Sequence, residues 1–193
     1  EVSSTATLNI KDGSFTTAIA EAWCADGYIP TTEVVGGTTY YTVKEGEYVA
    51  RNTTTGQGYE TLVEAVAAAA ADQEVKLLAN VTGAGLKINK DITIDFATYT
   101  YTVNQAVGSS GTETLGFQIL KDNDVTLKNG TLTSTAVTSG KEVKMLIQNY
   151  ADLTLTDMNL VDNTAHILYA LSNNSGNVNL DGNTNITTDA VAF

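Results

Sequence analysis

Aspartates are the side chains of this sequence whose spacing comes closest to a reactive site. Asp122 and Asp124 lie in one expected turn, and Asp157 and Asp162 lie about one repeat further along the chain. Glycoside hydrolysis requires paired carboxylates at a defined separation, and residues 122–124 partly match a calcium-binding loop. Aspartates in a turn more often only hold a solvated turn. We therefore expect no catalytic residue, no cofactor and no metal site, and leave adventitious calcium open.

The other reactive groups occur singly. Cys24 is the only cysteine, His166 the only histidine and Arg51 the only arginine. A disulfide within the chain and a cysteine-based zinc site are therefore excluded. We expect Cys24 to be a buried thiol in a helix, since no basic group lies near it in sequence to activate it. We expect His166 in a turn or at the surface and Arg51 paired with a local glutamate. The sequence thus predicts a protein that is not an enzyme.

Four tyrosines could stack on sugar rings if they share an exposed face. The alternation Tyr-Thr-Tyr is equally typical of a half-buried strand, so a role in the core stays open beside glycan stacking. These residues are Tyr40, Tyr41, Tyr99 and Tyr101.

Composition narrows the class of protein. The 193 residues carry 22 acidic and 10 basic side chains, a net charge of −12, which disfavours nucleic acid and anionic lipid as partners. No apolar run is long enough for a transmembrane helix, so we expect no membrane insertion. Threonine favours strands, and glycine and asparagine favour turns. We expect an all-β protein with many short strands, located outside the cell or at its surface.

The chain repeats one pattern, a short strand with apolar residues two apart, an Asn/Asp/Gly turn and another apolar residue. Leading apolar residues at 92, 125, 153 and 178 lie 33, 28 and 25 residues apart, a spacing typical of one coil of a β-solenoid. A β-sandwich of short strands is the alternative. The copies are 8–15, 125–132, 153–160 and 178–186, with 92–96 as a variant start.

Stacked coils should place equivalent side chains in columns. We expect two aliphatic columns, a second set of strands at 117–119, 145–147 and 169–171, and an asparagine ladder at Asn149 and Asn173. The columns are Ile92, Val125, Leu153, Val178 and Ile94, Leu127, Leu155, Leu180.

Local elements interrupt the repeats. Residues 59–71 predict a helix, since Leu62, Val63 and Val66 share one face, and such a helix could cover the open end of a solenoid. A weaker helix is expected at 16–25. Residues 38–43 and 47–50 predict a small hairpin with its turn at 44–46.

A resemblance adds to this interpretation. The segments 12–15, 24–28, 39–43, 59–66, 75–78 and 88–95 resemble modular bacterial cell-surface proteins with right-handed parallel β-helix (pectin-lyase-like) repeats. The resemblance implies that 1–57 holds the last coil of one module plus a helix and hairpin junction. It implies that 58–193 holds the start and first coils of the next. It is specific for architecture, and most members have no established reaction.

The two ends of the chain fit each other in pattern, since residues 185–193 would continue naturally into residues 3–10. This predicts either a window of a longer array or subunits that stack end to end; a monomeric fragment is the alternative. The expected self-association edges are Leu8, Ile10, Phe15, Ile186, Val191 and Phe193.

The sequence therefore favours a non-catalytic structural or adhesive module of a bacterial surface protein or extracellular filament. Its partners would be itself and, further, a host glycan or protein. The alternative is a carbohydrate-binding or carbohydrate-degrading β-helix, including a phage fibre or tailspike fragment.

Overall fold

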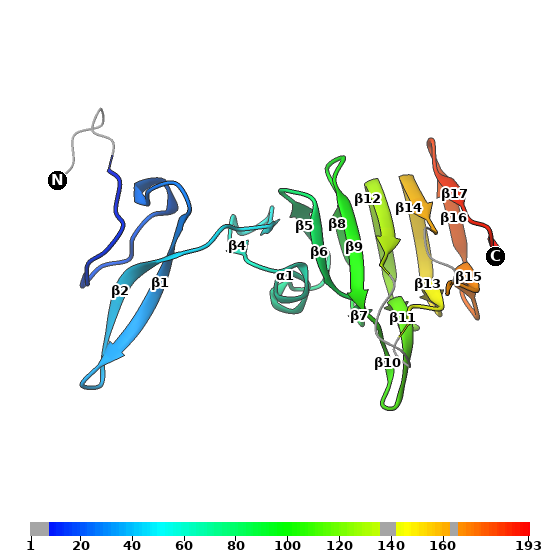
Figure 1. Ribbon diagram of the computed structural model, residues 1–193, viewed down its shortest axis with the longest axis horizontal. Helices are drawn as coiled ribbons and strands as arrows, with labels where there is room; N and C mark the ends of the chain where they lie inside the picture. The colour runs from blue at the N-terminus through cyan, green and yellow to red at the C-terminus, as the bar shows by residue number, and fades with distance from the viewer. Residues whose placement is uncertain (1–7, 136–141, 163–165) are drawn as a thin grey trace. The chain divides into compact units, whose positions relative to one another are not determined.

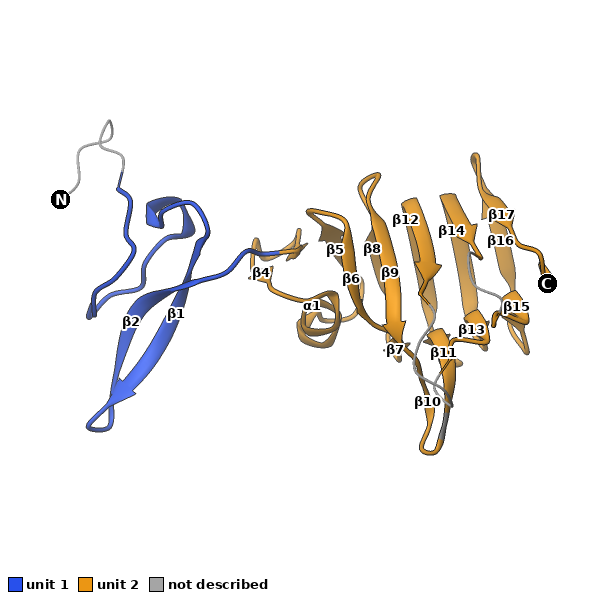
Figure 2. Cartoon of the chain, viewed as in Figure 1, with its two compact units in different colours: residues 1–48 blue, residues 49–193 orange. Residues whose placement is uncertain are grey.

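The computed structural model describes residues 8–135, 142–162 and 166–193. Contacts divide the chain into two compact units, Glu1–Tyr48 and Val49–Phe193 (Figure 2). Residues 49–57, which the sequence grouped with the first segment, therefore pack with the solenoid of the second unit.

The first unit is built on one antiparallel hairpin. Strand β1 (Tyr28–Val35) pairs with β2 (Thr38–Glu45) across a turn at Gly36 and Gly37. Both glycines have positive φ, 59° and 82°, as the tightest hairpin turn requires. The predicted hairpin of 38–43 with 47–50 is therefore wrong, because this glycine pair, and not residues 44–46, reverses the chain.

The helix predicted at 16–25 is also wrong. Only a single 3₁₀ turn, Glu21–Trp23, forms, and no side chain caps its start. Ile10 instead makes a parallel bridge with Cys24, and Phe15 an antiparallel bridge with Tyr41. The segment that resembled a solenoid strand thus pairs within the first unit.

The second unit is a parallel β-solenoid of about three turns, which confirms the predicted fold class (Figure 1). We call its longest stack of strands the first wall. Both predicted columns lie there in register, with Val125 between Ile92 and Leu153, and Leu127 between Ile94 and Leu155. The strands are β5 (Gln73–Leu77), β8 (Ile92–Asp95), β12 (Asp124–Ser134), β14 (Asp152–Val161) and β16 (Val178–Asp181).

The second wall confirms the predicted strands. Phe117 pairs with Ile147, and Leu115 pairs with Met145. Asn149 pairs with Asn173 as predicted. The wall contains β7 (Leu86–Ile88), β11 (Thr112–Ile119), β13 (Met145–Asn149) and β15 (Tyr169–Asn173), and β10 (Val107–Ser109) runs antiparallel to β11.

A third wall was not predicted. The second halves of β12 and β14 form it together with β6 (Val81–Ala84), β9 (Thr100–Gln105) and β17 (Asn185–Thr187). Leu132 lies between Tyr101 and Leu160 in one buried column of this wall. The three walls enclose a continuous hydrophobic core.

The first coil is covered, and the helix predicted at 59–71 does part of this. Helix α1 is shorter, Leu62–Ala68, and buries Leu62, Ala65 and Val66. Strand β3 (Ala50–Asn52) adds antiparallel to β5, and β4 (Gly58–Tyr59) pairs with β3. Among the described residues no helix has the length and apolar character to cross a membrane.

Two side chains fix the ends of α1. Thr61 Oγ1 accepts the N–H of Glu64 at 3.1 Å, a standard N-cap. The Lys90 ammonium group donates to the carbonyls of Val66, Ala67 and Ala69 at 3.2, 3.2 and 2.7 Å. A cation at these carbonyls stabilises the C-terminal end of the helix. Lys90 precedes β8, so it ties the helix to the solenoid.

One aliphatic column gives a direct test of the packing. Leu155 is fully buried in mid-column, whereas Leu180, its neighbour in register, is 43% exposed in the last coil. We expect Leu155→Ala to lower the free energy of unfolding by about 2–5 kcal/mol and Leu180→Ala by under about 1 kcal/mol. Urea unfolding followed by circular dichroism measures both, and equal losses would contradict this arrangement.

Candidate functional site

Carboxylates at the corner before the first wall bind the backbone of the next coil. The Asp91 carboxylate accepts the N–H of Asp124 at 2.7 Å. Two coils further along, Asp152 accepts both the backbone N–H and the side-chain amide of Asn177, at 3.0 and 2.7 Å. These aspartates therefore join successive coils.

The corner after the first wall repeats one left-handed backbone position. Asn129, Asp157 and Gly182 have φ of 61°, 52° and 59° and share one register position. Asp157 accepts the N–H of Asn183 at 2.8 Å, and a side chain at Gly182 would overlap that carboxylate. This is the structural role of the Asn/Asp/Gly turn in the repeat.

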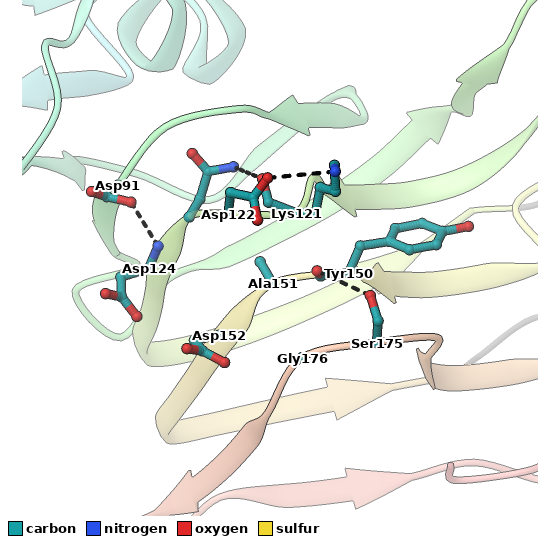
Figure 3. A pocket seen from close by; sticks show the side chains of 10 residues that line it. Asp91, Lys121, Asp122, Asp124, Tyr150, Ala151, Asp152, Ser175 and Gly176 are labelled. Carbon is teal, nitrogen blue, oxygen red and sulfur yellow. Dashed lines mark hydrogen bonds and ion pairs between the residues drawn. The ribbon is translucent and has the colours of Figure 1, made fainter.

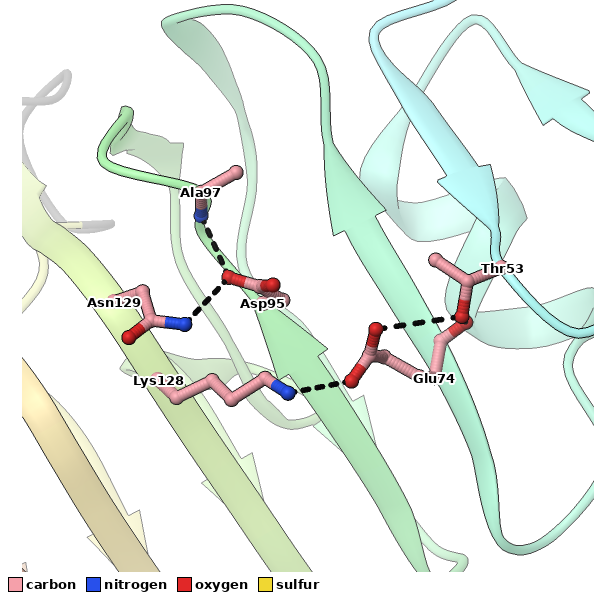
Figure 4. A network of polar contacts seen from close by, with 6 residues as sticks. All are labelled: Thr53, Glu74, Asp95, Ala97, Lys128 and Asn129. Carbon is pink, nitrogen blue, oxygen red and sulfur yellow. Dashed lines mark hydrogen bonds and ion pairs between the residues drawn. The ribbon is translucent and has the colours of Figure 1, made fainter.

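A polar network crosses the first wall (Figure 4). Lys128 on β12 reaches past β8 to Glu74 on β5, with Nζ and Oε2 2.6 Å apart, and the Thr53 hydroxyl donates to the same carboxylate at 3.3 Å. The two charged side chains are partly exposed, so the ion pair adds modestly to stability.

The corners between the second and first walls differ in length, and this leaves a cavity of about 420 Å³ (Figure 3). The corner from Ile119 to Asp124 is two residues longer than the corner from Asn149 to Asp152. The corner that follows, from Asn173 to Asn177, is one residue longer than the corner from Asn149 to Asp152. The short corner forms the floor between two longer neighbours. The lining residues are Asp91, Lys121, Asp122, Asn123, Asp124, Tyr150, Ala151, Asp152, Ser175 and Gly176.

Hydrogen bonds within this cavity position Tyr150. The Asn174 amide donates to the Tyr150 hydroxyl at 2.9 Å, and the Ser175 hydroxyl donates to the Tyr150 carbonyl at 3.2 Å. Asp122 lies 3.6 Å from the Lys121 ammonium group, but both side chains are over three-quarters exposed. The cavity thus offers an aromatic ring and several carboxylates to a polar ligand.

The structure separates the predicted aspartates. Asp122 and Asp124 line the cavity, whereas Asp157 holds the opposite corner and Asp162 accepts the Thr188 hydroxyl. Within the described ranges, no group of three or more His, Cys, Asp or Glu side chains has the arrangement of a metal site. Sequence reasoning missed Tyr150; counting residues between the asparagine ladder and the first wall could have found the cavity.

The predicted asparagine ladder is confirmed. The buried Asn149 amide donates to Asn173 Oδ1 at 2.9 Å and to the Ala151 carbonyl at 2.8 Å. Its own oxygen accepts the Ala151 N–H at 3.2 Å. Full pairing allows this polar side chain to stay in the interior.

The four predicted tyrosines do not form one stacking face. Tyr101 is buried in the core beside Phe117, with ring centroids 5.8 Å apart, so its proposed contact with a sugar is wrong. Tyr99 is half-buried against the core. Tyr40 and Tyr41 are half-buried neighbours in β2, so their side chains point to opposite faces of the hairpin.

Cys24, His166 and Arg51 are the reactive residues that occur once, and each has an identifiable local environment. Cys24 follows the 3₁₀ turn, half-buried, and burial together with the charge of Glu21 raises the pKa of its thiol. This keeps the thiol protonated. His166 is exposed in a turn, as predicted. Arg51 donates to the Gly56 carbonyl at 2.7 Å.

The predicted association edges fall in both units. Leu8, Ile10 and Phe15 lie in the first unit, where Ile10 and Phe15 already bridge other segments. The other three lie in the last coil, where Ile186 pairs with Leu160, and Val191 bridges Tyr169. Phe193 is 63% exposed. The outer edges of β16 and β17 carry no strand among the residues described.

Comparison of the chain with protein-family models, with curated proteins and with solved structures found no match. The resemblance to modular cell-surface proteins therefore stays an expectation from the sequence.

The buried hydroxyl group of Tyr101 allows a test of the core. Its hydroxyl donates to the Ala84 carbonyl at 2.6 Å, and burial raises the pKa of the phenol well above its usual value of about 10. Tyr101→Phe should therefore lower the free energy of unfolding at pH 7 by about 1 kcal/mol.

The pH dependence follows from the sign of that shift. The raised pKa contributes stability that is complete below about pH 10 and is lost as the pH rises, by up to about 1.4 kcal/mol per pH unit. Urea unfolding between pH 9 and 11.5 should show wild-type stability falling faster than that of Tyr101→Phe. Parallel curves would show that the hydroxyl ionises as readily in the folded protein as in the unfolded chain.

Proposed function

We propose that this chain is a non-catalytic structural module of an extracellular assembly at a bacterial surface. The observation that carries the proposal is the use made of its acidic side chains. Asp91, Asp95, Asp152 and Asp157 all accept hydrogen bonds at the corners, from backbone groups or from side chains of the next coil. These four carboxylates thus hold corners and join coils.

A stiff rod is the mechanical consequence. Each coil is held by continuous backbone pairing in three walls and by aliphatic columns, so coils stack like the repeats of other solenoids. The net charge of −12 keeps such rods soluble and opposes their sideways association.

The last coil is the joining end in this proposal. Its exposed large apolar side chains include Leu180 at 43%, Val191 at 49% and Phe193 at 63%. Exposed strand edges pair readily with further strands. A second copy of the chain that adds to this edge would extend the rod.

Sedimentation over a concentration series, with negative-stain microscopy, tests this function. We expect unbranched rods that lengthen with concentration. Phe193→Asp should lower the association constant at least about tenfold by placing a charge at the contact. Val34→Asp, an equally drastic change at an exposed hairpin residue, is the matched control. A chain that stays monomeric at all concentrations would refute end-to-end joining.

Carbohydrate binding is the second candidate, favoured by the corner cavity. Tyr150, Asp122, Asp124 and Asp152 are among the residues that line it, and an aromatic ring with polar groups in one cavity suits a sugar. If this function holds, a glycan array should detect a ligand, and Tyr150→Ala should reduce its affinity at least about tenfold. Tyr40→Ala, outside the cavity, should leave the affinity unchanged. Release of cleaved sugar would instead indicate an enzyme.

A further inference from the structure

A groove of about 520 Å³ separates helix α1 from strand β7 at the covered end of the solenoid. The helix side of this groove, which we call the α1–β7 groove, presents Val63, Val66 and Ala67. Val63 is 39% exposed although it is a large apolar residue. The sheet side comprises Gly85, Leu86, Lys87, Asn89, Lys90 and Val107.

One edge of β7 faces this groove. Among the strands of the described chain, β7 pairs with β11 alone, with Leu86 opposite Phe117. The Ile88 carbonyl accepts the N–H of Leu120 on that side. Because successive residues of a strand direct their backbone groups to opposite edges, the N–H and C=O of Lys87 point toward the groove. An apolar wall beside a strand edge is suited to receive one further strand.

The last coil carries a segment that already makes one isolated parallel bridge to a strand of this same wall. Val191 bridges Tyr169 in parallel, and the Ala170 N–H donates to the Val191 carbonyl at 3.0 Å. Two residues further on, Phe193 falls at the register position of Leu171, Ile147, Phe117 and Leu86. In a parallel stack Phe193 of one copy would therefore lie beside Leu86 of the next.

The lining of the groove is basic, whereas the last coil carries acidic side chains. Lys87 and Lys90 line the groove, in a chain with only 10 basic residues. The last coil carries Asp181 and Asp189, both exposed. A basic groove and an acidic last coil favour the meeting of these two surfaces over that of two last coils.

We propose that the α1–β7 groove receives residues 190–193 of a second copy as a parallel strand added to β7. The proposal rests on the structural function above and names the surface that receives the joining end. Strand β3 already covers β5 in the first wall, whereas the second wall offers the edge of β7. Such a contact between two different surfaces does not close on itself, and it propagates into a filament.

A substitution in the α1–β7 groove distinguishes this proposal from the general proposal that copies of the chain join end to end. Val63→Glu lies outside the buried face of α1 and should preserve the circular dichroism spectrum. It should lower the association constant measured by sedimentation at least about tenfold, because a carboxylate would enter the apolar wall. Val34→Glu, the same change at an exposed residue of the hairpin, should leave association unchanged.

The outcomes distinguish the two ideas. If Phe193→Asp abolishes association and Val63→Glu does not, the last coil joins elsewhere, the groove proposal falls and the structural function stands. If the wild-type chain stays monomeric, both the groove proposal and end-to-end joining are refuted.

Discussion

Register between coils is the constraint on which the rest of this structure depends. In a parallel stack each residue must lie over its equivalent, as Val125 does between Ile92 and Leu153. A slip of one residue would turn every aliphatic side chain of a strand from the core to solvent. The left-handed position shared by Asn129, Asp157 and Gly182 and the fully bonded Asn149 fix this register at the corners.

Sequence periodicity predicted the features that lie within one strand and recur from coil to coil. The columns of the first wall could be predicted because their apolar residues alternate and a recognisable turn follows. The third wall could not, because residues 131–134 and 159–161 continue the same strands past that turn. Tyr101 shows the limit of alternation: the pattern says that one face is buried, but not which one, and the core contains this tyrosine.

Features that depend on comparing coils were harder to predict. The corner cavity arises because one corner is shorter than its neighbours, and no residue within that corner signals this. The α1–β7 groove depends on where a helix of seven residues packs, which Lys90 decides from a later part of the chain. The hairpin was mispredicted because the turn was assigned to residues 44–46, although the pair Gly36-Gly37 between two strand-like runs is the stronger signal of a tight turn.

The cover of the first coil has a consequence for how the protein is made. The covered coil, with β3, β4 and α1, is synthesised before the coils that stack on it. Each later coil then leaves the ribosome next to a finished edge that can template its pairing, so folding can proceed in step with translation. Because helix α1 covers the first coil on one side, later coils can add only on the other side.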